Sequence, residues 1–271
     1  MEVSVIIPTY KPNSYIVDCI ESLKNQSFSS DLYEVIIVLN GEREPYFAYV
    51  ESLISEMKNF NLYYTEQKGV SNARNFGINM SKGSFLAFID DDDEVSSNYL
   101  SVLFNEGKVI NKFDCIIQSN VIAIKENVIY EDYISKAYLK LKNKEYNILT
   151  HRKFLSNVNG KMYSRKVIGN IRFDTRLSVS EDALFLFELS VNLGRIKLVE
   201  NEECIYYRKV RGNSLTTTKK SSKEYSLLFF TKLSLFTKVY LGNISKYNFI
   251  FYLTRVLAIV KVYFYELRRN M

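Results

Sequence analysis

The chain contains few of the residues on which several common kinds of site depend. Its 271 residues include only three cysteines, Cys19, Cys115 and Cys204, which lie far apart without paired spacing. This spacing predicts neither a disulfide framework nor a zinc site, and we expect each cysteine to be a small core residue in a reducing compartment. The single histidine, His151, argues against histidine-rich metal sites and histidine-dependent nucleophilic triads.

Targeting and linker segments are missing from the sequence as well. Met1 leads directly into the strand-like segment Val3–Ile7, so we identify no signal peptide and expect a cytoplasmic protein. The sequence has no internal repeat and no low-complexity linker. The polar stretch 212–223 is the one plausible boundary, so we expect one large α/β domain with an appendage.

Charge is distributed unevenly along the chain. Residues 1–204 carry 23 Lys and Arg against 28 Asp and Glu, a net charge of −5. Residues 205–271 carry 13 against 2, a net charge of +11. This split predicts a basic C-terminal part that binds an anion, which could be a nucleic acid, a membrane surface or a phosphorylated substrate.

The first hundred residues alternate between strand and helix patterns. Ile16, Cys19, Ile20 and Leu23 recur at i, i+3, i+4 and i+7, which is typical of an amphipathic helix packed on a sheet. Further helices are predicted at Tyr46–Met57 and Val70–Met80. Strands are predicted at Val3–Ile7, Val35–Leu39, Leu62–Thr65 and Phe85–Ile89. This series predicts a mostly parallel sheet with right-handed crossovers, flanked by helices.

The pattern after residue 110 is less regular. Strands are predicted at Cys115–Ile124 and Ile205–Tyr207, and helices at Tyr130–Lys142 and Glu181–Leu193. From Ser221 onward the sequence is helical in pattern, aromatic and lysine-rich. We therefore expect a C-terminal helical extension.

Four consecutive carboxylates, Asp90–Asp93, follow the apolar segment Phe85–Ile89 directly. A short apolar run of this kind is typical of a buried central strand, and open α/β sheets bind their ligands beyond the carboxyl ends of such strands. Mutual repulsion among the acids is relieved by solvent or by a hard cation. Because Mg²⁺ and Mn²⁺ are commonly held by one or two carboxylates plus substrate phosphates, the placement favours a metal–diphosphate site over a solvated acidic turn.

Two other strand ends carry polar or aromatic residues. The first strand runs into Pro8-Thr9-Tyr10, and the second ends at Asn40-Gly41. In a parallel sheet these positions meet the acids at one edge. An aromatic ring, an amide and a cation-binding acid cluster together suit a nucleoside diphosphate.

Five segments occur in an order that points to a known family. They are Val5–Tyr10, Gly69–Gly77, Gly83 with Asp90–Asp93, Phe173–Asp174 with Ser180–Asp182, and Tyr206–Arg208 with Asn213–Thr216. Together they resemble the inverting family-two glycosyltransferases with the GT-A fold, over roughly residues 1–215. The resemblance implies a Rossmann-like α/β domain with a nucleotide-sugar-binding half at 1–110 and an acceptor half at 111–215. Residues 216–271 would form the basic aromatic extension.

The resemblance also implies roles for individual residues. Asp182 would be the general base, and Asp92, helped by Asp90, would hold Mn²⁺ or Mg²⁺. The nucleotide-sugar would be bound by Pro8, Thr9, Tyr10, Asn40, Arg74, Asp91 and Arg208. Thr9 and Tyr10 would lie at the nucleobase, and Arg208 with the loop 212–216 would fold over the diphosphate. Asn40 stands where the family usually carries aspartate; its carbonyl still accepts from a uracil ring N–H, so the expected donor is a UDP-sugar.

The segment Phe249–Tyr265 is almost wholly apolar or aromatic. Arg255 and Lys261 interrupt it, and two central cations cost about 2.5–3.5 kcal/mol each in a membrane span, which argues against one. Two alternatives stay open. The segment is either an interfacial helix on an anionic membrane, which would place the protein at the inner face of the cell membrane, or part of a helical hairpin packed on its own domain or on a second copy of the chain.

Two other classes of function compete with sugar transfer. Phosphatases with an aspartyl nucleophile also place acids after an apolar strand, but normally after the first one, whereas three strand–helix units precede Asp90 here. A non-catalytic binding protein would use the basic tail alone. Its basic residues are interleaved with an apolar helix rather than spread over a groove, so no nucleic-acid partner is expected. The expected partners are a nucleoside-diphosphate sugar and a saccharide or lipid-linked saccharide acceptor.

Overall fold

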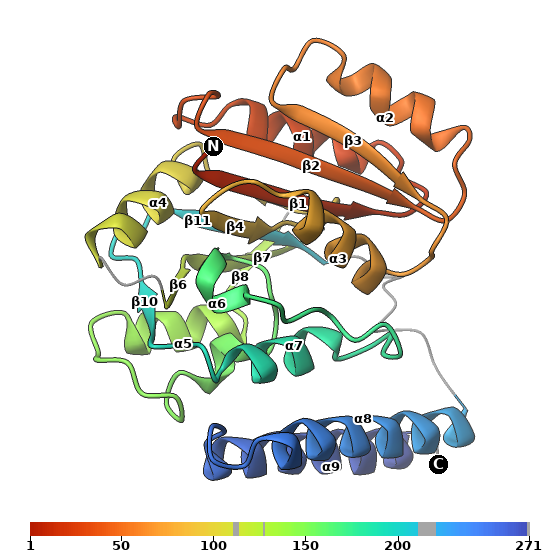
Figure 1. Cartoon of the computed structure of the whole chain (residues 1–271), viewed down its shortest axis with the longest axis vertical. Coiled ribbons are helices and arrows are strands. Elements are labelled where there is room, and N and C mark those ends of the chain that lie inside the picture. Colours follow the sequence, from red (N-terminus) through yellow and green to blue (C-terminus); the bar gives the residue numbers. More distant parts are fainter. Residues whose placement is uncertain (111–113, 127, 211–220, 270–271) are drawn as a thin grey trace.

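Seven strands form the central sheet of the computed structural model, which describes residues 1–110, 114–126, 128–210 and 221–269 (Figure 1). In spatial order they are β10 (Arg195–Leu198), β6 (Cys115–Gln118), β9 (Lys161–Ser164), β4 (Phe85–Phe88), β1 (Val3–Thr9), β2 (Tyr33–Asn40) and β3 (Phe60–Thr65). β4, β1, β2 and β3 are parallel, β6 and β10 are parallel, and β9 is antiparallel to β4 and β6. The predicted, mostly parallel sheet is confirmed.

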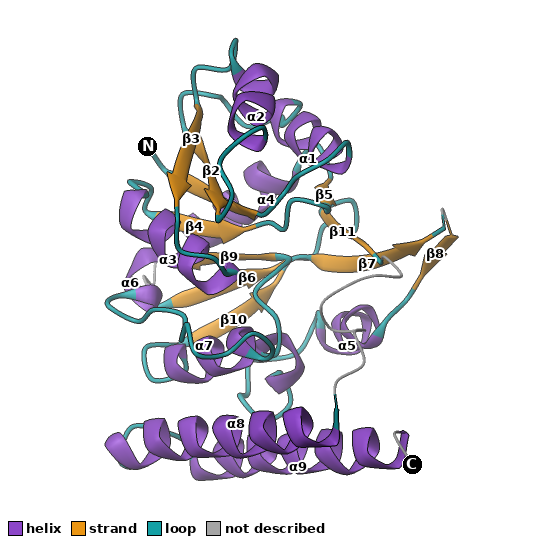
Figure 2. Cartoon of the chain, turned by 90° about the vertical axis from the view of Figure 1, so that its right-hand side faces the viewer, coloured by secondary structure: helices purple, strands orange, loops and turns teal. Residues whose placement is uncertain are grey.

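Helices cover both faces of this sheet, which explains why its central strands are mostly apolar. α1 (Tyr15–Lys24) and α4 (Tyr99–Val109) cover one face, and α3 (Val70–Met80) and α6 (Arg165–Ile168) cover the other (Figure 2). α2 (Tyr46–Ile54) packs beside β3. Every residue of β1 and β2 is buried, as expected for parallel strands between two helical layers. The carboxyl ends of β1, β2 and β4 therefore meet at one edge of the sheet.

A second sheet of four strands adjoins this edge in the order β5 (Glu94–Val95), β11 (Ile205–Lys209), β7 (Asn120–Lys125) and β8 (Val128–Tyr130). The prediction of a single strand over 115–124 is therefore wrong, because β6 and β7 belong to different sheets. Ser119 separates them: its N–H and its hydroxyl both donate to the carbonyl of Gly160, at 3.0 and 3.1 Å.

Three predicted helices begin or end elsewhere. α2 starts at the predicted Tyr46 and ends at Ile54, before the predicted Met57. α5 (Tyr133–Leu141) starts three residues after the predicted Tyr130, because the Asp132 carboxylate accepts from the N–H groups of Ile134 and Ser135 and caps the helix there. α7 (Glu181–Leu189) starts as predicted and ends before the predicted Leu193. The strands β5, β8, β9 and β10 were not predicted.

The C-terminal residues form a helical hairpin of α8 (Ser222–Gly242) and α9 (Phe249–Arg269). Phe187 of α7 packs against it, with ring centroids 4.9 Å from Tyr247 and 5.6 Å from Phe251. Arg255 donates to the carbonyls of Arg152 and Leu155 in the short helix η1 (Arg152–Leu155), at 2.9 and 2.8 Å. The predicted boundary at 215 lies outside the described residues. No helix in the described part of the chain is long and apolar enough to cross a bilayer.

α3 lies unusually close to β1 because a glycine faces the strand. A Cβ atom on Gly77 would lie 2.4 Å from Cγ2 of Ile6, a buried side chain. We expect Gly77→Ala to lower the free energy of unfolding by about 1–3 kcal/mol, the usual cost of overpacking, as measured by urea denaturation.

Gly242 provides a matched control, since a Cβ atom there meets nothing within 4 Å. Gly242→Ala should leave stability unchanged or raise it by up to about 1 kcal/mol. Equal urea midpoints for the two variants would contradict the close approach of α3 to β1.

Candidate active site

The ends of β1 and β2 are joined to the start of α3 by one buried amide. The Asn40 side chain donates to the carbonyl of Thr9 at 2.7 Å and accepts from the N–H of Gly69 at 2.9 Å. The Thr9 hydroxyl in turn donates to the carboxylate of Asp91. The structure therefore brings together Thr9, Asn40 and Asp91, which the sequence placed at the nucleotide.

Pro8 and Tyr10 differ in their exposure at this edge. Pro8 is buried within β1, whereas Tyr10 is 45% exposed. The Tyr10 ring lies against Gly41, where an added Cβ atom would be 2.9 Å from Cε2 of the ring. An exposed ring on a fixed backbone is available for stacking on a base.

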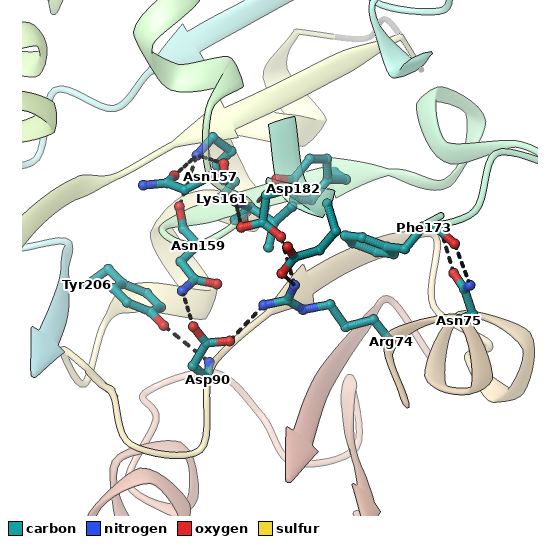
Figure 3. A network of polar contacts seen from close by, with 12 residues as sticks. Arg74, Asn75, Asp90, Asn157, Asn159, Lys161, Phe173, Asp182 and Tyr206 are labelled. Atoms are coloured by element: carbon teal, nitrogen blue, oxygen red, sulfur yellow. Dashed lines mark hydrogen bonds and ion pairs between the residues drawn. The ribbon is translucent and has the colours of Figure 1, made fainter. Parts of the chain in front are cut away.

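Arg74, on α3, is the centre of the polar network in Figure 3 and is only 3% exposed. Its Nη2 lies 2.9 Å from the carboxylate of Asp90, and its Nη1 lies 2.7 Å from that of Asp182. Glu181 lies 3.7 Å from Nη1, and the guanidinium carbon is 5.3 Å from the Phe173 ring centroid. Burial opposes the charge, but the carboxylates raise the pKa of Arg74 above its ordinary value. One cation thus joins the acid run after β4 to the first turn of α7.

Asp182 occupies a setting that suits proton transfer. Burial raises its pKa above the ordinary value, against the opposing effect of Arg74, and the charge of Asp90 raises it further. The N–H of Val158 donates to its Oδ2 at 3.2 Å. Burial and the neighbouring Asp182 also raise the pKa of Glu181. A carboxylate with a raised pKa is a stronger base near neutral pH.

Asp90 is held from a second direction by residues that sequence reasoning did not find. Asn159 donates to its Oδ2 at 2.6 Å. The buried Lys161 donates to the carbonyls of Asn157 and Asn159, at 2.8 and 3.0 Å (Figure 3). No motif marks these residues, because Asn159 meets Asp90 across 69 positions of the chain and Lys161 meets backbone carbonyls.

Three members of the acid run converge on one point. Carboxylate oxygens of Asp90, Asp92 and Asp93 all lie within 4.8 Å of one another. Asp93 is 2% exposed and accepts from the Tyr206 hydroxyl at 2.6 Å and from the N–H of Lys209 at 2.8 Å. Burial, followed by the charges of Asp90 and Asp92, raises its pKa well above the usual range. An all-oxygen donor set of this kind fits Mg²⁺ or Mn²⁺.

Arg208 is directed toward α5 in this structure. Its Nη2 lies 2.9 Å from Asp132, the residue that caps α5. The loop 212–216, predicted to close over the diphosphate together with Arg208, lies outside the described residues. The contact with Asp132 joins β11 to α5.

Replacement of Arg74 tests the network. In Arg74→Met the acids lose their buried counter-charge, and we expect the free energy of unfolding at pH 7.5 to fall by about 3–5 kcal/mol. The pKa of Asp182 is already raised, and loss of Arg74 raises it further. The native state then binds protons that the unfolded chain releases, so stability falls as pH rises through this range. Urea denaturation at pH 5 and pH 7.5 should therefore show a larger loss at pH 7.5.

Arg176→Met is the control, since that side chain is 61% exposed and pairs with Asp174. We expect it to change stability by less than about 0.5 kcal/mol at both pH values. An Arg74→Met variant with the same pH dependence as the wild type would contradict the network.

Comparison with known proteins places this arrangement in a family. The model of Glycosyl transferase family 2 matches residues 4–172. The chain is 27% identical over 239 residues to the minor teichoic acid biosynthesis protein GgaB of Bacillus subtilis, covering 84% of this chain and 26% of GgaB. It is 28% identical over 259 residues to the poly(ribitol-phosphate) β-N-acetylglucosaminyltransferase TarP of Staphylococcus aureus, covering 90% of this chain and 74% of TarP.

Solved structures show the same fold. Residues 1–349 of S. aureus TarS, crystallised with UDP-GlcNAc, superpose with a TM-score of 0.75 at 19% identity, covering 96% of this chain and 72% of that chain. In sequence, the chain is 24% identical to TarS over 228 residues and spans 39% of its length. The ordered motifs, the sheet and the family model agree, and the chain belongs to glycosyl transferase family 2.

Proposed function

We propose that the chain transfers a sugar, with inversion, from a nucleoside-diphosphate sugar to a carbohydrate hydroxyl. The observation that carries this proposal is Arg74, which holds Asp182 on one side and Asp90 of the acid run on the other. The base and the acids that would hold a cation on the diphosphate are thus kept in one rigid arrangement. UDP is the preferred nucleotide, since TarS was crystallised with UDP-GlcNAc. The names of the relatives favour a teichoic acid-like polymer as acceptor.

On the acceptor side, Asp182 is the general base. It takes the proton of the acceptor hydroxyl as that oxygen attacks the anomeric carbon from the face opposite the diphosphate. Burial raises the pKa of Asp182 and makes it a better base. A positioned base of this kind contributes about 10²–10⁴-fold to the rate. The hydrogen bond from Val158 and the ion pair with Arg74 orient its carboxylate.

On the donor side, the nucleotide is bound at the ends of β1, β2 and β4. Tyr10 stacks on the base beside Pro8 and Thr9, and Asn40 holds these segments together at the nucleobase. Asp91 contacts the ribose or the sugar. Arg208, which pairs with Asp132 in the structure, serves the diphosphate once that ion pair is released. Asp92 and Asp90, with Asp93 beside them, would hold Mn²⁺ or Mg²⁺. A bound divalent cation supplies Lewis-acid stabilisation of the charge on the departing nucleoside diphosphate.

Nucleotide release from a panel of nucleoside-diphosphate sugars that includes the UDP-sugars tests this function. We expect turnover of at least one UDP-sugar to depend on Mn²⁺ or Mg²⁺. Asp182→Asn should lose about 10²-fold or more of kcat, because it removes the base, while UDP affinity measured by calorimetry changes little. No response to any nucleoside-diphosphate sugar would overturn the proposal.

The exposed Asp31 at the far end of β2 provides the control. Asp31→Asn changes the same chemical group and should retain wild-type turnover. Near-wild-type transfer by Asp182→Asn would remove Asp182 from the role of base.

We also propose that the chain works at an anionic membrane, which it contacts through the outer side of its C-terminal hairpin. The inner side packs on α7 and η1, whereas Phe230, Leu257 and Phe264 on the outer side are 63%, 66% and 57% exposed. The exposed cations of the same hairpin are Lys223, Lys238, Lys246, Lys261 and Arg268. Aromatic and aliphatic side chains interleaved with cations suit an interface with anionic headgroups. Pairing with a second copy through this surface would bring like charges together, which disfavours a homodimer there.

Vesicle flotation tests the membrane surface. We expect the wild type to float with phosphatidylglycerol-containing vesicles, less at high salt, and to stay behind with phosphatidylcholine alone. Leu257→Glu with Phe264→Glu should reduce recovery with the anionic vesicles by about fivefold or more, since both substitutions place charge in the apolar contact.

Val109→Glu is the control, because Val109 is 81% exposed on α4, away from the hairpin. It should float like the wild type. Equal flotation of all three proteins would refute the membrane surface, and a wild-type dimer that the double substitution dissociates would identify a second copy as the partner instead.

A further inference from the structure

One short turn, residues 157–160, reaches both halves of the active site. The N–H of Val158 donates to Asp182, and the side chain of Asn159 donates to Asp90. Asp90 and Asp182 are therefore bridged twice, once by Arg74 and once by this turn (Figure 3). The position of the turn decides how the base lies relative to the acid run.

The backbone of the turn is held by buried donors. The hydroxyl of Tyr163 donates to the carbonyl of Val158 at 2.8 Å. Gln118 donates to the carbonyl of Gly160 at 2.9 Å. Lys161 donates to the carbonyls on both sides of Val158, those of Asn157 and Asn159, and to the Asn157 side chain at 2.9 Å.

Lys161 is well suited to hold this turn, and burying its charge would cost free energy if it had no such acceptors. Its side chain is completely buried at the start of β9. An ammonium group has three N–H donors, and the turn supplies three acceptors at 2.8, 2.9 and 3.0 Å. A buried charge is expensive unless it is paired and hydrogen-bonded, so an apolar residue would serve better if β9 needed only packing.

We propose that Lys161 is a positioning residue for sugar transfer, which holds the turn 157–160 so that Val158 and Asn159 orient Asp182 and Asp90. The inference rests on the proposed function. Lys161 acts through the turn and touches no reacting atom. Its loss should therefore impair the chemical step more than the binding of the donor.

The protonation of Lys161 makes the pH dependence of kcat a readout, which a lysine that served only packing would not change. Burial lowers its pKa to about 7, against the opposing charge of Asp182. The turn also meets Asp90 directly, through Asn159. It reaches Arg74, and Glu181 beside it, through Asp182. Above its pKa the amine offers only two donors for three acceptors. We therefore expect kcat of the wild type to decline between about pH 7 and pH 9.

The experiment compares Lys161→Met with the wild type in the nucleotide-release assay. We expect kcat to fall by about 10- to 100-fold, as displacement of a catalytic group by about 1 Å can cause, with KM for the donor within about threefold. The alkaline decline should disappear in the variant. Lys166→Met, an exposed lysine on α6, is the matched control and should resemble the wild type.

The outcomes separate the inference from the proposed function. A wild type without transfer activity defeats the proposed function itself. A folded Lys161→Met with kcat within twofold of the wild type, or with the same alkaline decline, defeats the role of Lys161 alone. If Lys161→Met loses cooperative unfolding, Asn159→Ala carries the test, since it removes only the donor to Asp90 and must lower kcat without changing UDP affinity.

Discussion

The contact on which the rest of the site depends is the buried guanidinium of Arg74 between Asp90 and Asp182. A cation at 3% exposure needs counter-charges within hydrogen-bond distance, and here they come from two distant segments, the end of β4 and the start of α7. The close approach of α3 to β1 at Gly77 brings the arginine to this point. Helix packing and charge pairing therefore determine the same geometry.

The turn 157–160 adds a second bridge between the same two acids. A single ion-paired arginine leaves each carboxylate free to rotate about its own side chain. A further donor on the other oxygen of each carboxylate, from Val158 and Asn159, restricts that rotation. The proposed transfer with inversion requires the base and the leaving group on opposite faces of one carbon, so restricted orientation would favour it.

Of the two alternatives that the sequence left open for the C-terminal hairpin, the structure shows packing on its own domain, and the membrane contact stays a proposal. One side packs on the domain through Phe187 and through Arg255, whose hydrogen bonds to η1 explain a cation within an apolar segment. The other side keeps large apolar residues exposed among cations. A helix of mixed aromatic and basic composition can pack on the domain with one face and leave the opposite face exposed for a membrane.

The sequence by itself determined the central strands and the edge that carries the candidate site, because apolar runs ending in polar residues reflect burial between helices. It also predicted Asp182, Arg74 and the acids, through ordered motifs. Tertiary structure alone decided that Ser119 divides one predicted strand between two sheets, that Asp93 joins Asp90 and Asp92, and that Lys161 supports the turn beside Asp182. Ser119 donates to a carbonyl 41 residues away, the three acids converge because the backbone turns after β4, and Lys161 is buried among backbone carbonyls. None of these features leaves a local pattern of residue types.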